Sequence, residues 1–171
     1  MLKILIAAAA LMFAATPVSA EVIARTADSF TLRYQSAMET TPEDILSSMT
    51  LVGEWWDGAH SYSGDAKNIT IDMTVGGCWC EKLADGTDFR HATVLAIEPD
   101  RLAFNAPFGP LNGKATRADF TVAWPGDNKG WMVTWVMVIE GPGLGAYADA
   151  VDGVMGAGFG RFTRYLEYGE V

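Results

Sequence analysis

The segment "VGGCWCEKLADGTDFRHATVLAIEPDRLAF", residues 75–104, carries the strongest strand and turn signals in the chain. An Asp-Gly turn follows "CWCEKL", and Pro99-Asp100 separates "FRHATVLAIE" (89–98) from "RLAFNA" (101–106). Short runs of apolar, β-branched and aromatic residues between such turns are typical of antiparallel strands joined by hairpins. We therefore expect three sequential antiparallel strands in this part of the chain.

Two further strands are predicted before this segment. Apolar and polar residues alternate over 29–39 and, strictly, over 69–75, which is the pattern of a half-buried strand. Because paired glycines allow a strand to bend or bulge, we expect the second strand to bend at Gly76 and Gly77 and to continue as "CWCEKL".

A helix is predicted between these two strands. Thr41 precedes Pro42, Glu43 and Asp44, and a hydroxyl cap, a first-turn proline and first-turn acids are typical of a helix N-terminus. The helix should end near Trp55-Trp56. A polar loop with His60 follows, and we expect it at the mouth of a cavity.

The second half of the chain predicts a hairpin and a long closing helix. Residues 117–124 and 131–140 read as strands paired across "PGDNKG". Apolar residues then recur at steps of three or four: Leu144, Ala148, Val151, Met155, Phe159, Phe162 and Leu166. A run of antiparallel strands with helices on one side is an α+β architecture.

The first twenty residues read as a bacterial export signal. Lys3 supplies a positive start, an apolar run follows, and Val18-Ser19-Ala20 fits a small-residue cleavage site. We expect cleavage after Ala20 and a single domain over residues 21–171. The mature protein would be periplasmic or secreted, where disulfides persist.

Charge and composition exclude several classes of partner. Loss of Lys3 with the signal takes the net charge from −9 to −10. We therefore expect no nucleic-acid partner, because such proteins carry basic surfaces. We expect no stable membrane insertion after signal cleavage. The composition does not indicate an oligomeric state.

A weak cofactor signal lies between the last strand and the closing helix. "GPGLGA" (141–146) imitates a dinucleotide fingerprint. The βαβ unit that this fingerprint requires is missing, and no strand follows to supply a carboxylate for a ribose. We expect no cofactor.

The only two cysteines, Cys78 and Cys80, lie two apart on one face of the same predicted strand. Their Cα atoms would be about 6.5 to 7 Å apart in a regular strand, the upper limit for a disulfide. We expect small thiols packed in the core; a local disulfide and a metal or redox site are the alternatives. Zinc would need four ligands, and His60 and His91 lack ligand spacing, so we expect no metal.

One acid–base pair is predicted on the opposite face of the strands. Trp79 and Glu81 should point away from the cysteines. Phe89, His91, Thr93, Leu95 and Ile97 share one face of the next strand, and we expect Leu95 and Ile97 to be buried. His91 would then face a cavity near Glu81, where the pair either orients a ligand or forms a simple hydrogen bond at the sheet rim.

The order of these elements resembles the helix-grip fold of the START-like (SRPBCC) group, which includes polyketide cyclases, lipid-transfer domains and activator-of-Hsp90-ATPase homologues. "TPEDILSSMT…EWW", residues 75–104 and "GFGRFTRYLEYG" carry the resemblance over about residues 30–169. "HSYSGDA", "GGCWCE" and "GPLN" resemble a branch with signal peptides. The resemblance implies a curved sheet wrapped around a long C-terminal helix, with a cavity between them.

Three functions are compatible with this fold, because one fold hosts many activities. The first is binding of a small hydrophobic or amphipathic ligand. The second is a cyclase- or hydrolase-like enzyme with His91 as base and Glu81 as its partner. The third is a protein-interaction module like the Hsp90-activator relatives. The expected ligand-binding residues are Trp56, Met73, Trp79, Glu81, His91, Phe104, Trp135, Met137, Met155 and Phe159.

The closing helix contains a further hint of a cavity. Gly153, Gly156, Gly158 and Gly160 lie within it, and each costs about 1 kcal/mol of helix stability relative to alanine. Close packing on the sheet, a kink or a gap for a ligand would account for them.

Overall fold

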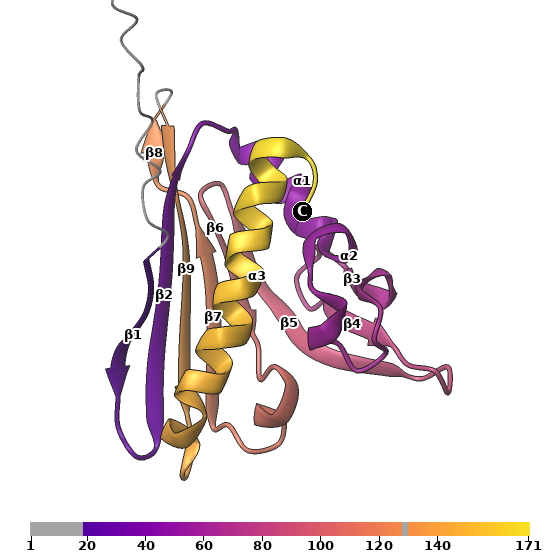
Figure 1. The fold of residues 1–171 in the computed structure, drawn as a ribbon, viewed down its shortest axis with the longest axis vertical. Helices are drawn as coiled ribbons and strands as arrows, with labels where there is room; N and C mark the ends of the chain where they lie inside the picture. Colours follow the sequence, from indigo (N-terminus) through magenta and orange to yellow (C-terminus); the bar gives the residue numbers. More distant parts are fainter. Residues whose placement is uncertain (1–18, 128–129) are drawn as a thin grey trace, which may run out of the picture.

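The computed structural model describes residues 19–127 and 130–171. The predicted signal peptide therefore lies outside the described residues except for its last two positions. A curved antiparallel sheet crosses the molecule, and the long C-terminal helix α3 lies against one of its faces (Figure 1). This arrangement confirms the predicted α+β helix-grip layout.

The sheet has the order β1-β2-β9-β7-β6-β5-β4-β3, with β8 paired to β9. From β4 to β9, apart from β8, each strand pairs with the next along the chain, which confirms the predicted run of antiparallel strands. The first predicted strand, β2, lies against the last, β9, along ten residue pairs. The strands are β1 (Ser19–Arg25), β2 (Ser29–Met38), β3 (Ile69–Ile71), β4 (Cys78–Lys82), β5 (Asp88–Glu98), β6 (Arg101–Asn105), β7 (Arg117–Ala123), β8 (Gly126–Asp127) and β9 (Gly130–Glu140).

The helices are α1 (Pro42–Thr50), α2 (Val52–Trp55) and α3 (Ala148–Tyr168), with short 3-10 helices η1 (Gly58–His60), η2 (Ala66–Asn68), η3 (Gly109–Leu111) and η4 (Leu144–Tyr147). The predicted helix start is confirmed, because the Thr41 hydroxyl oxygen accepts a hydrogen bond from the backbone N–H of Asp44. The predicted single helix is interrupted at Leu51, so that α2 carries its final turn.

The strand predicted over residues 69–75 is shorter in the structure. β3 ends at Ile71 and pairs antiparallel with β4, with Ile71 opposite Trp79. Gly76 and Gly77 therefore lie in the connection of a hairpin and not within one bent strand. The left-handed backbone of Gly76, with φ of +86°, suits this turn. Met73 lies in the same connection, where it is half-buried.

The predicted inward face of β5 is wrong beyond His91. Leu95 and Ile97 are 51% and 37% exposed, whereas Ala92 and Val94 are buried. The cause is a β-bulge: Trp79 pairs with Ala92 and Cys80 with Arg90, so His91 is an extra residue without a direct partner on β4. One extra residue reverses the alternation of a strand, and it leaves both His91 and Ala92 buried.

Aromatic side chains fill the space between the sheet and α3. Trp55 contacts Phe162 and Trp135 with ring centroids 5.1 Å and 5.9 Å apart. Arg161 of α3 donates a hydrogen bond to the Trp55 carbonyl oxygen at 2.7 Å. Through Trp55, α2 therefore contacts both α3 and strand β9 of the sheet.

The glycines of α3 have different neighbours. A Cβ atom on Gly158 would lie 2.6 Å from the indole of Trp56. A Cβ atom on Gly153 or Gly160 would have no neighbour within 4 Å. At Gly158, the cost of glycine is therefore offset by close packing against a tryptophan.

This difference yields a matched pair of variants. Gly160→Ala should raise the free energy of unfolding by about 0.5–1 kcal/mol, because alanine favours the helix and meets no neighbour. Gly158→Ala should be less stable than Gly160→Ala by about 1–3 kcal/mol, because the methyl group overpacks against Trp56. Urea unfolding of both variants measures the difference; equal stabilities would contradict the packing of Trp56 on Gly158.

Candidate functional site

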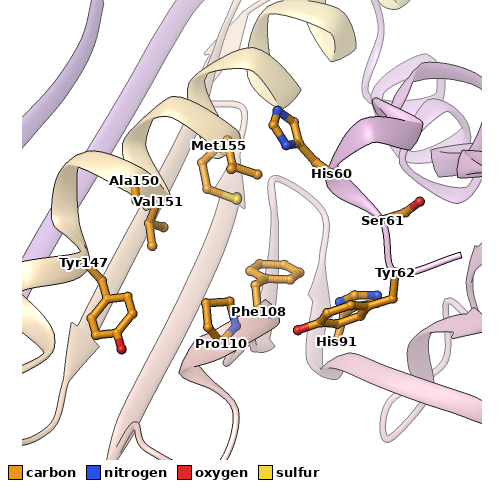
Figure 2. Close-up of a pocket in the computed structure, with 12 residues that line it drawn as sticks. His60, Ser61, Tyr62, His91, Phe108, Pro110, Tyr147, Ala150, Val151 and Met155 are labelled. Atoms are coloured by element: carbon orange, nitrogen blue, oxygen red, sulfur yellow. The ribbon is translucent and has the colours of Figure 1, made fainter. Parts of the chain in front are cut away.

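A cavity of about 250 Å³ opens between α3, η3 and the segment at the end of η1. Figure 2 shows its two ends: Tyr147 lies at one, and the rings of Tyr62 and His91 lie at the other, with Phe108 and Pro110 between them. Three parts of the chain line it: the start of α3 with the preceding residue, the segment after η1, and the segment at η3 together with His91 of β5. The lining residues are His60, Ser61, Tyr62, His91, Phe108, Gly109, Pro110, Tyr147, Ala150, Val151, Val154 and Met155.

Two of the ten expected ligand-binding residues, His91 and Met155, line this cavity. The others do not, because contacts among the aromatic rings already fill the deep space between sheet and helix. Glu81 lies behind His91, and Met73 lies in the β3–β4 connection. The remaining six are buried core residues: Trp56, Trp79, Phe104, Trp135, Met137 and Phe159.

Most of the lining was not identified from the sequence. Tyr62, Phe108 and Pro110 lie in irregular segments without hydrophobic periodicity, and contacts between distant parts of the chain bring them together. His60 was expected at a cavity mouth, and the structure places it in the lining. The apolar periodicity of the closing helix included Val151 and Met155, but periodicity does not separate core positions from cavity walls.

Glu81 is the most completely enclosed charged residue of the site, with no exposed surface. Its Oε2 atom lies 2.8 Å from Nε2 of His91 and accepts a hydrogen bond from the backbone N–H of Tyr62 at 3.1 Å. Its Oε1 atom accepts a further hydrogen bond from the backbone N–H of Ser63. A carboxylate held by several donors in this way is satisfied although it is buried.

These contacts determine the charge state of the pair. Burial by itself would raise the pKa of Glu81, but the hydrogen bonds from Ser63, His91 and Tyr62 outweigh it and lower the pKa below its ordinary value. Burial lowers the pKa of His91, and the hydrogen bond and negative charge of Glu81 offset this only in part. At neutral pH the pair is therefore a carboxylate beside a neutral imidazole.

The tautomer of His91 follows from this charge state. An ionised carboxylate can only accept a hydrogen bond, so Nε2 of the neutral ring must carry the hydrogen and donate a hydrogen bond to Glu81. The other ring nitrogen, Nδ1, is then a free acceptor. Within residues 19–127 and 130–171 it has no hydrogen-bond partner and is not among the fully enclosed polar atoms.

Aromatic rings hold the orientation of His91. Tyr62 stacks on the imidazole with an interplanar angle of 10° and a centroid distance of 5.9 Å. Phe89 contacts both rings edge-on: its ring centroid lies 4.8 Å from that of the imidazole and 4.8 Å from that of Tyr62. Because Tyr62 also donates its backbone N–H to Glu81, one residue positions both members of the pair.

The opposite end of the cavity has a cation close by. Nζ of Lys114 donates a hydrogen bond to the Tyr147 hydroxyl at 3.0 Å and lies 5.1 Å from the centre of that ring. The cavity therefore has two polar ends and apolar walls between them.

The expectation that Cys78 and Cys80 are core thiols is wrong, because the two cysteines form a disulfide. Both are half-buried on the outer face of β4, whereas Trp79 and Glu81 point inward. Their Cα atoms are 5.3 Å apart, shorter than the spacing of about 6.5 Å or more in a regular strand. The register shift between β4 and β5 falls within the same segment, between Trp79 and Cys80.

In residues 19–127 and 130–171, no three His, Cys, Asp or Glu side chains gather closely enough to hold a metal ion. No helix of this part of the chain combines the length and apolar character needed to cross a bilayer.

No protein-family model and no curated protein sequence matches the chain. The fold has many counterparts among solved structures. The conserved protein of unknown function EF2215 from Enterococcus faecalis superimposes with a TM-score of 0.59 at 10% identity, covering 90% of this chain and 79% of that one.

Two counterparts come from biosynthetic loci or pathways. DynU16, from the dynemicin biosynthetic locus, has a TM-score of 0.56 at 21% identity and covers 82% of this chain. The di-domain ARO/CYC StfQ, from the steffimycin biosynthetic pathway, has a TM-score of 0.50 at 7% identity and covers 80%. This chain spans 48% and 51% of their respective lengths. At these identities the comparison shows a shared fold.

The depressed pKa of His91 predicts how acid acts on the protein. The unfolded chain binds a proton at His91 below about pH 6.5, whereas the folded chain does so only at a lower pH. Stability should therefore be complete above about pH 6.5 and fall as the pH drops toward the folded pKa of His91. Glu81, whose folded pKa is also lowered, adds a second loss below its ordinary pKa of about 4.3.

NMR titration of the His91 ring measures the first step. We expect a midpoint below pH 6.5, and a still lower midpoint in Glu81→Gln, because Glu81 raises the pKa of its neighbour. That variant should also lose about 1–3 kcal/mol of stability through imperfectly paired backbone donors. A His91 midpoint at or above pH 6.5 in the unmodified protein would contradict the assignment of a neutral ring.

Proposed function

We propose that this protein binds a small apolar or amphipathic molecule in the cavity at His91. The observation that carries the proposal is an apolar cavity containing one nearly buried histidine, 8% exposed, whose Nδ1 atom has no partner among the described residues. Ligand sites combine apolar walls with a small number of placed polar groups in this way.

The walls favour an apolar body of modest size. Val151 and Met155 of α3 face Phe108 and Pro110 across the cavity. Val154 of the same helix also lines it, and none of these side chains offers a strong hydrogen bond. Filling the cavity would remove apolar surface from water on both sides. Its volume of about 250 Å³ is slightly below the range of about 300–1,000 Å³ for drug-sized ligands, which favours a small molecule.

His91 selects the polar end of the ligand. Its free Nδ1 atom accepts a hydrogen bond, so a ligand with a hydroxyl or amide donor would satisfy it, whereas an analogue without a donor would leave it unpaired. Leaving a buried acceptor unsatisfied costs about 1–3 kcal/mol. The shared fold with the ARO/CYC protein StfQ supports a small-molecule ligand.

Export to the periplasm or the medium is part of the proposal, and one measurement tests both parts. Native mass spectrometry of protein from the exported fraction should give a chain beginning at Glu21, with extra mass that leaves on denaturation. A protein that is missing from the exported fraction and is recovered from the cytoplasm with segment 1–20 retained would contradict export. A ligand-free chain that also fails to bind the amphipathic probe 1-anilinonaphthalene-8-sulfonate would contradict ligand binding.

Two alanines of α3 provide matched variants for that probe. Ala150 lines the cavity, whereas Ala157 is exposed on the same helix and is not part of the lining. Ala150→Phe should weaken probe binding about tenfold, corresponding to about 1.4 kcal/mol, because the ring occupies the cavity. Ala157→Phe should leave the affinity unchanged. Equal affinities for the two variants would place the probe elsewhere.

A second candidate function is acid–base catalysis on the bound molecule. It is favoured by the 2.8 Å contact between Glu81 and His91, because a carboxylate that orients a neutral imidazole leaves the other nitrogen able to remove a proton. Glu81 would act as the positioning residue.

His91→Gln separates catalysis from binding. Its amide N–H can still donate to Glu81, whereas alanine would leave the buried carboxylate short of a donor. The variant cannot accept a proton, so turnover of the co-purified molecule should fall at least about 100-fold while its affinity changes little. Unchanged turnover in a folded His91→Gln variant would rule out His91 as the base.

A further inference from the structure

The disulfide has no part in the proposed ligand site. Cys78 and Cys80 lie on the outer face of β4, opposite to the face that carries Trp79 and Glu81. They are half-buried, so solvent reaches them from the side of the sheet away from α3.

The disulfide is expected to stabilise the fold only slightly. It closes a ring with one intervening residue, and the entropy that a cross-link removes from the unfolded chain grows with the number of residues enclosed. β4 is in addition already held by backbone pairing to β3 and β5. Stabilisation of the fold therefore gives no strong reason for this bond.

A cation lies along the same face. Arg90 of β5 is directly opposite Cys80, and Thr93 is directly opposite Cys78; paired residues of adjacent strands share a face. Nη1 of Arg90 donates a hydrogen bond to Oγ1 of Thr93 at 3.3 Å. The Arg90 side chain therefore extends from the Cys80 level to the Cys78 level, beside both half-cystines.

No neighbour among the described residues neutralises the charge of Arg90. In the described part of the chain, no carboxylate forms an ion pair with it. A guanidinium beside cysteine sulfur stabilises the thiolate form. It therefore favours both the approach of an attacking thiolate and the thiolate released when the disulfide opens.

We propose that Cys78–Cys80 is a thiol–disulfide exchange site, with Arg90 as its positioning and charge-stabilising residue. Its reaction partner is a dithiol, on a protein or a small molecule. This activity does not involve the cavity, because the disulfide and the cavity lie on opposite faces of the sheet.

The exchange proceeds in two balanced steps. A thiolate of the partner attacks one sulfur of the disulfide; the bond between Cys78 and Cys80 breaks, its electron pair stays on the released cysteine as a thiolate, and a mixed disulfide forms. The second thiol of the partner, as thiolate, then attacks the partner's own sulfur in the mixed disulfide; the bond from that sulfur to the cysteine breaks, and the cysteine leaves as a thiolate that takes up a proton. The partner leaves oxidised, and its two electrons and two protons reside on Cys78 and Cys80.

The experiment follows the redox state of the protein directly. The protein is equilibrated in buffers of reduced and oxidised dithiothreitol or glutathione, quenched with iodoacetamide and weighed intact. Because Cys78 and Cys80 are the only cysteines, two added alkyl groups report reduction without ambiguity. We expect a reversible transition with an unchanged circular dichroism spectrum, so that exchange occurs in the folded protein.

Two arginine variants test the role of charge. Arg90→Gln should slow reduction by glutathione about three- to tenfold, because the stabilising charge is lost. Arg33→Gln removes the same charge from an exposed position on β2, four strands away from β5 in the sheet, and should leave the rate unchanged.

Three outcomes would overturn the proposal. The first is a disulfide that resists excess dithiothreitol until the protein unfolds. The second is a reduced protein that oxidised glutathione cannot reoxidise. The third is the same reduction rate in Arg90→Gln and Arg33→Gln.

Discussion

The burial of one carboxylate constrains the whole site. Glu81 has no exposed surface, and an isolated ionised group could not remain charged there. It is stable because Tyr62 and Ser63 donate their backbone N–H groups and His91 donates Nε2–H. Those donors come from the segment after η1 and from β5, so the need to satisfy Glu81 attaches that segment to the sheet. The attached segment forms one wall of the cavity.

The aromatic core decides where a ligand can go. Trp55, Trp135, Phe159 and Phe162 contact one another with centroid distances between 5.1 and 5.9 Å, so the middle of the space between sheet and α3 is filled. Among the described residues, a cavity remains toward the N-terminal end of α3, where Ala150, Val151 and Val154 and residues of η3 are part of its lining. The aromatic core therefore leaves no large chamber in the middle of this space, and the cavity that remains is small and has His91 at one end.

The β4–β5 pair carries different chemistry on its two faces. Inward, Glu81 and His91 form a shielded acid–base pair; outward, Cys78, Cys80 and Arg90 lie together on partly exposed surface. The bulge at His91 supplies the extra residue that keeps His91 and Ala92 buried together. The register shift lies between Trp79 and Cys80, within the segment of β4 that the disulfide spans.

Local patterns in the sequence determined the α+β class, most strand positions, the Thr41 helix cap and the closing helix, because alternation, capping and helical periodicity involve residues close together in the chain. They also indicated the approach of His91 to Glu81. Only the tertiary structure decided the exposure of Leu95 and Ile97, the disulfide and the cavity lining. The exposure of Leu95 and Ile97 follows from one extra residue in the pairing of β4 with β5, and the disulfide needs a Cα separation shorter than that of a regular strand. The lining depends on side chains far apart in sequence that meet through the burial of Glu81 and the packing of α3, and no local pattern encodes such contacts.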